Sequence, residues 1–195
     1  MEEKIYASEL SGHCNEPTAW QILNEVSEAL LRKGLRPIDP YCIEIRDDGH
    51  FSLASAIESA SHNGFDAPEA TENHITESEA VWSLGASVFF VVMGCHVMNG
   101  KGGKGQQESS KLPYMRSEWP ELSELVQHCL RFNPVQRPTL QQIHEKASQQ
   151  YQRCIDTIRK GPKLKTAEKA SPTETDPVQD LDFWPETMQK PSSNP

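Results

Sequence analysis

Five cysteines and seven histidines are the side chains of this sequence best suited to nucleophilic or metal chemistry. Cys95-His96 and His128-Cys129 are adjacent pairs, but neighbouring side chains seldom converge on one metal ion. Cys42 and His50 can be drawn as a nucleophile and its base, yet nothing in the sequence positions a third group or an oxyanion site. The cysteines include no CxxC pair, which favours reduced thiols in a cytoplasmic protein. We therefore expect no metal and no cofactor.

The glycine-rich segment 99–110, NGKGGKGQQESS, invites comparison with a phosphate-binding loop. A P-loop needs Ser or Thr after Gly-Lys, a different glycine spacing and a helix start behind it, and this segment has none of them. We expect a flexible connection instead. The net charge of −9 also argues against a nucleic-acid partner, which would need clustered Lys and Arg. It permits a basic protein or peptide partner, and equally a plain acidic surface.

The elements that must position these residues are mainly helical. Apolar side chains at helical spacing over 16–33 predict an amphipathic helix, with Asn15 as its cap and Gly34 as its stop. Residues 79–98 are apolar on every side, which is typical of a helix inside a domain. Their β-branched members leave a strand possible over the second half, although the length favours a helix.

Two more helices follow in the last third of the folded part. Pro120 opens the first of them. Thr139 and Gln142 form a capping box for the second, which ends at Gly161-Pro162.

A short β element interrupts the helices. Residues 41–46 and 50–53 alternate in polarity around Asp-Asp-Gly, which predicts a β-hairpin, and 55–76 reads mainly as loop. The expected fold class is therefore mainly α, with one short β-hairpin and a central buried helix.

Three parts of the chain follow from this pattern: an N-terminal extension over 1–9, a folded domain over 10–160, and a disordered tail over 161–195. The tail is rich in Pro, Ser, Thr, Glu and Lys and cannot bury enough apolar surface to fold. It contains an acidic, aromatic cluster at Asp182, Phe183 and Trp184. This cluster is a candidate docking motif for a partner, a segment that folds back on its own domain, or an inert stretch.

The N-terminal residues MEEKIYASEL are acidic and polar, unlike a signal or transit peptide. The longest apolar run, 86–93, is too short to span a bilayer. We expect a cytoplasmic protein without a membrane partner.

Three motifs follow one another along the sequence: Phe65-Asp66-Ala67-Pro68-Glu69, Val81-Trp82-Ser83-Leu84-Gly85 and Asn133-Pro134-Val135-Gln136-Arg137-Pro138. With the order of elements, they resemble the C-lobe of the protein kinase family, where Ala-Pro-Glu, a central helix and a late arginine follow one another. The resemblance covers roughly residues 10–151. Because only about fifteen residues precede the first helix, we expect no N-lobe. Among domains that lack an N-lobe, the chain resembles the kinase non-catalytic C-lobe (KIND) domain, which binds protein segments.

The resemblance places neutral residues where a kinase carries its chemistry. Pro37 stands at the position of the catalytic base and has no proton acceptor. Cys42 replaces the magnesium-binding asparagine, although a thiol is a poor ligand for Mg²⁺. Ser55 replaces the metal-binding aspartate of Asp-Phe-Gly. Asp39 is an alternative acid if the local alignment shifts.

Residues that resemble the structural positions of the family are kept. Glu69, after Pro68, is similar to the kinase glutamate that pairs with a buried arginine, and Arg137 matches that arginine. Trp82 would anchor the central helix. The aspartate that braces the catalytic loop in kinases is replaced by Ala80, with Glu79 beside it.

The resemblance therefore implies a catalytically inactive kinase-like module, a pseudokinase, that binds protein and serves as a scaffold or regulator in signalling. The alternative is a divergent Ser/Thr kinase fragment that needs an N-lobe supplied in trans. A third hypothesis is a remnant without a partner.

Overall fold

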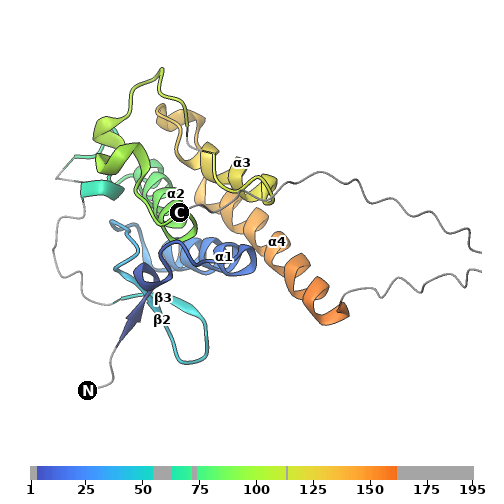
Figure 1. Ribbon diagram of the computed structural model, residues 1–195. Coiled ribbons are helices and arrows are strands. Elements are labelled where there is room, and N and C mark those ends of the chain that lie inside the picture. Colours follow the sequence, from blue (N-terminus) through green and yellow to red (C-terminus); the bar gives the residue numbers. More distant parts are fainter. Residues whose placement is uncertain (1–3, 55–62, 72–73, 113, 162–195) are drawn as a thin grey trace, which may run out of the picture. The chain divides into compact units, whose positions relative to one another are not determined.

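A computed structural model describes residues 4–54, 63–71, 74–112 and 114–161 of the chain. The predictions for Ser55 and for the tail with Asp182, Phe183 and Trp184 lie outside these residues. The described residues form one compact unit, whose path is shown in Figure 1.

Helix α1, Glu16–Lys33, has the bounds that the sequence predicts. The Asn15 side chain accepts a hydrogen bond from the Thr18 backbone N–H at 3.0 Å and so caps the first turn. Gly34 ends the helix with φ of 99°, a conformation that favours glycine. The predicted apolar stripe is buried along its length, which places one face of α1 in the core.

Helix α2, Glu77–Met93, is the central buried helix, and every residue from Glu79 to Val92 is buried. Its second half is helical, so the alternative of a strand there is wrong. The helix ends at Met93 rather than Met98, because Gly94 adopts a left-handed conformation with φ of 73°. Within the described residues, no helix is both long and apolar enough to cross a bilayer.

Helix α3, Pro120–Cys129, and helix α4, Leu140–Lys160, complete the helical part. The capping box predicted at Thr139 and Gln142 is confirmed, with each side chain bonded to the other residue's backbone N–H. Helix α4 packs along α1, while α2 contacts both α1 and α3 (Figure 1).

The β element is a three-stranded antiparallel sheet in the order β1-β2-β3. Strands β2, Ile43–Ile45, and β3, Phe51–Leu53, form the predicted hairpin. Strand β1, Ile5–Tyr6, pairs with β2 and was not predicted, because two residues are too short to show an alternation. The expectation of one hairpin alone is corrected accordingly.

Short 3-10 turns connect these elements: Ala7–Leu10, Asn63–Phe65, Val97–Gly100, Gly102–Gly105 and Pro134–Gln136. Two of them fall in or at the edge of segment 99–110, which the sequence predicted to be a flexible connection. Gly102, Gly103 and Gln106 of this segment are buried, so the segment is a packed part of the domain.

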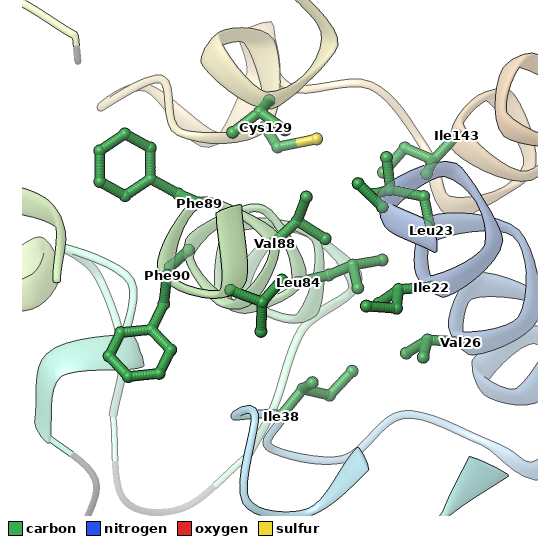
Figure 2. Close-up of a cluster of buried hydrophobic side chains, with 14 of the residues drawn as sticks. Ile22, Leu23, Val26, Ile38, Leu84, Val88, Phe89, Phe90, Cys129 and Ile143 are labelled. Atoms are coloured by element: carbon green, nitrogen blue, oxygen red, sulfur yellow. The ribbon is translucent and has the colours of Figure 1, made fainter. Parts of the chain in front are cut away.

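The core joins side chains from all four helices. Figure 2 shows Leu84 and Val88 of α2 between Ile22 and Val26 of α1 on one side and Cys129 of α3 on another. Ile38 reaches the same cluster from the loop after α1 and is 3% exposed. Truncating a buried isoleucine costs about 2–5 kcal/mol, so Ile38 fastens this loop firmly to the core.

Candidate functional site

The loop between α1 and β2 carries Pro37 and Cys42, two positions that the sequence resemblance matched to kinase catalytic groups. Pro37 is exposed and offers no side-chain proton acceptor. Cys42 is 7% exposed, and its Sγ donates a hydrogen bond to the Asp39 carbonyl oxygen at 3.2 Å. Burial raises the pKa of the Cys42 thiol to about 11. The sulfur is therefore protonated at neutral pH and suits neither nucleophilic attack nor magnesium binding.

Asp39, the alternative acid, shapes the turn of this loop. Its Oδ1 accepts hydrogen bonds from the backbone N–H groups of Tyr41 at 2.8 Å and Cys42 at 2.9 Å. This is an Asx turn, which fixes the backbone through a carboxylate oxygen. Arg36 adds a second tie by donating from Nη1 to the Ala54 carbonyl at 2.7 Å. The loop is thus held by side chains of its own.

Glu79 and Ala80, which the sequence resemblance matched to the kinase brace, lie in the first turn of α2. Glu79 Oε2 accepts from the Thr76 backbone N–H at 2.7 Å, and Thr76 Oγ1 accepts from the Glu79 N–H at 3.2 Å. These two bonds form a capping box. The acid nearest to the brace position therefore caps its own helix, and Ala80 carries no polar group.

His50, drawn from the sequence as a base for Cys42, has another partner. Its Nδ1 lies 2.6 Å from Glu25 Oε1. The Glu25 hydrogen bond raises the pKa of the His50 imidazole. Since Cys42 is bonded to Asp39, the geometry gives no support to a cysteine–histidine dyad. In the part of the chain that the structure describes, no cluster of three or more His, Cys, Asp or Glu residues could hold a metal ion.

Glu69 and Arg137, far apart in the sequence, form the ion pair that the sequence analysis expected. The guanidinium donates to both carboxylate oxygens, from Nη1 to Oε1 at 2.5 Å and from Nη2 to Oε2 at 2.9 Å. It also donates to three backbone carbonyls, those of Ser78 at 2.9 Å, Arg131 at 2.7 Å and Phe132 at 2.9 Å. All five N–H donors of the arginine are therefore used.

The burial of this pair explains why so many acceptors surround it. The Arg137 side chain is 0% exposed and that of Glu69 is 29% exposed. A buried charge must be paired and hydrogen-bonded to offset its desolvation. The pair ties the loop before α2 to the turn between α3 and α4.

Trp82 of α2 is connected to the end of α3 through a buried glutamine. Its indole N–H donates to Gln106 Oε1 at 3.1 Å, and Gln106 Nε2 donates to the Leu130 carbonyl at 2.6 Å. Trp82 is 0% exposed and Gln106 is 6% exposed. The glutamine thus satisfies a buried indole N–H and a carbonyl at the end of α3.

Gly103 fits against Pro68, the proline of Ala-Pro-Glu. A Cβ on Gly103 would lie 2.2 Å from the Pro68 nitrogen and 2.4 Å from the Ala67 carbonyl carbon. The Gly103 N–H also donates to the Asp66 carbonyl at 2.8 Å. Only glycine allows this approach, so the glycine-rich segment holds the loop of Glu69 in place.

No protein-family model matches this sequence. The roles of these residues therefore depend on their geometry. That geometry brings Glu69 and Arg137 together in one polar cluster, with Pro68 packed beside it on Gly103. Pro37 and Cys42 lie in the separate loop after α1.

The sequence analysis missed two residues of the glycine-rich segment, Gln106, which bonds to Trp82 and Leu130, and Gly103, which packs on Pro68. Gln106 lies in a segment so rich in glycine and polar residues that it predicts a loop. Gly103 gave a weak signal, since a glycine with no turn to form often marks a close backbone approach.

Proposed function

We propose that this chain is a noncatalytic domain of the protein kinase C-lobe type that acts by binding another protein. The observation that carries the proposal is the contrast between two groups of residues. Arg137 keeps five hydrogen bonds and its carboxylate partner Glu69, whereas Pro37 and a protonated Cys42 stand where a kinase needs a base and a metal ligand.

The last turn of α1 and the loop after it also present apolar side chains to solvent. Leu31 is 45% exposed, Leu35 is 41% exposed and Tyr41 is 43% exposed. They flank Pro37 in the sequence, and Leu35 and Tyr41 lie in the segment that resembles the kinase catalytic loop. Exposed large apolar groups that gather on one surface are typical of sites that contact other proteins. This supports protein binding as the use of the loop.

Affinity capture tests the proposal. The tagged full chain is compared with a triple variant in which Leu31, Leu35 and Tyr41 are changed to Ser, and bound proteins are quantified. We expect a protein that the full chain retains and the variant loses, while the circular dichroism spectra of the two remain the same. Equal recovery by both chains would show that this loop contacts no partner.

The Asp39→Asn variant tests the alternative function, a divergent kinase fragment that needs an N-lobe supplied in trans. Phosphate transfer by the full chain and its captured partner, lost on Asp39→Asn, would establish a divergent kinase completed in trans.

A further inference from the structure

A pocket of about 350 Å³ lies between the solvent-facing side of α1 and the β2–β3 hairpin. Figure 1 shows the hairpin beside α1. Glu25 holds the two walls together, because its Oε2 accepts from the Phe51 backbone N–H and its Oε1 from His50, each at 2.6 Å. Gln21 adds a bridge by donating to both Glu25 and the Gly49 carbonyl, each at 3.0 Å. The pocket is therefore a fixed feature between two secondary-structure elements.

One acceptor in the wall of this pocket lacks a donor. Asn24 lines the pocket, and its Oδ1 is buried without a hydrogen-bond partner among the described residues. A buried polar atom left unpaired costs about 1–3 kcal/mol. A ligand that brings an N–H group to Asn24 recovers that cost, and an extended peptide backbone carries such groups at regular intervals.

The charges around the pocket leave one cation without a counterion. Glu28 pairs with Arg32 at 3.0 Å, and Arg46 pairs with Asp48 at 2.7 Å. Lys33 lines the pocket with Arg46 and takes part in none of the ion pairs between described residues. Glu25 is occupied by the hairpin. A carboxylate is therefore the ligand group that complements this rim.

We propose that this pocket binds an extended peptide segment with an acidic side chain. Asn24 Oδ1 accepts a backbone N–H of the segment, and Lys33, with Arg46 beside it, receives the carboxylate. This inference rests on the proposed protein-binding function and specifies the chemistry of the partner. The net charge of −9 permits a basic partner for the chain as a whole, whereas this pocket selects an acidic one.

The test uses the ¹⁵N-labelled full chain and two defined peptide mixtures. Both are nine residues long with Ala, Leu and Ser at random around the centre, and the central residue is Glu in one and Gln in the other. We expect the Glu mixture to shift the amide signals of Asn24, Lys33 and Ser52 and to bind at least about tenfold more tightly than the Gln mixture.

Variants of the rim separate the proposed contacts from general charge. Lys33→Glu should weaken binding of the Glu mixture at least about tenfold, and Glu28→Lys should strengthen it. Lys111→Glu makes the same charge change at an exposed site outside the pocket and should have little effect. Asn24→Ala should weaken both mixtures by a similar factor, because it removes an acceptor for the backbone.

Three results would each overturn the proposal. They are equal binding of the Glu and Gln mixtures, equal effects of Lys33→Glu and Lys111→Glu, and no binding at millimolar peptide. Adding ATP and Mg²⁺ to the same samples distinguishes failure of the pocket proposal from failure of the proposed noncatalytic function. Without a magnesium-dependent response, failure of the peptides rejects the pocket and leaves the noncatalytic function standing. A magnesium-dependent ATP response that Asp39→Asn abolishes would reject the noncatalytic function even if the peptides bind.

Discussion

Replacing Arg137 with methionine removes all five N–H donors of the guanidinium while keeping most of the side-chain volume. The change leaves the Glu69 carboxylate and three backbone carbonyls without the donors they have now. Breaking a buried ion pair by removing one partner costs about 3–5 kcal/mol. For a domain of this size that corresponds to a melting temperature lower by about 6–20 °C.

Glu69→Gln should cost less, because the Glu69 side chain is 29% exposed and one oxygen acceptor remains. The loss of one hydrogen bond between charged groups is worth about 1.5–3 kcal/mol. In the double variant the same interaction cannot be lost twice, so the two effects should not add. We expect a coupling free energy of more than about 1 kcal/mol.

The assay is equilibrium urea unfolding of the full chain, followed by circular dichroism. Arg153→Met is the matched control, because Arg153 is exposed and should change the stability by less than about 0.5 kcal/mol. Effects of Arg137→Met and Glu69→Gln that add within about 0.5 kcal/mol would refute the reasoning, since they would mean that the pair contributes nothing as a pair.

Three further predictions concern other parts of the fold. Gly103→Ala should lower the melting temperature markedly, because a Cβ on Gly103 would lie 2.2 Å from the Pro68 nitrogen; an unchanged melting temperature would mean that the contact with the Ala67–Pro68 peptide is relaxed in solution. In the native chain at pH 7.5 a thiol reagent should modify exposed Cys95 well before buried Cys42, whose pKa is raised to about 11, and rapid modification of Cys42 would contradict its burial. Glu25→Gln should lower the pKa of His50 in an NMR titration, since Glu25 holds that pKa above its usual value. The His50–Glu25 contact should therefore stabilise the fold below the ordinary histidine pKa of about 6.5 and lose that effect as the pH rises through the raised value; an unchanged titration in the variant would reject the contact.

The helices could be predicted from the sequence because their signals are local. Asn15 and Gly34 mark the ends of α1 by side-chain and backbone chemistry that acts within one turn. The end of α2 was placed too late, because the apolar residues continue beyond Gly94 and periodicity alone does not show a left-handed stop. The strand β1 is two residues long, and only its pairing with Ile45 and Glu44 makes it a strand.

The residues around the ion pair could likewise be predicted from the sequence only in part. Glu69 and Arg137 belong to motifs that resemble a known family, so their pairing could be expected without any contact in hand. Gln106 has no such motif, and its importance comes from bonds to Trp82 and Leu130 that exist only in the folded chain. The role of Asp39 could not be read as acid or turn former until its bonds to the backbone were seen.

Binding of ATP with Mg²⁺ to the full chain tests the proposed absence of phosphoryl-transfer chemistry most directly. Ligand at a hundred times its dissociation constant stabilises a native protein by about 2.7 kcal/mol, which at this size raises the melting temperature by about 5–11 °C. We predict no magnesium-dependent rise at 5 mM ATP. A rise of that size that Asp39→Asn abolishes would contradict the account, because it would show that the Asp39 carboxylate still helps to bind the magnesium nucleotide.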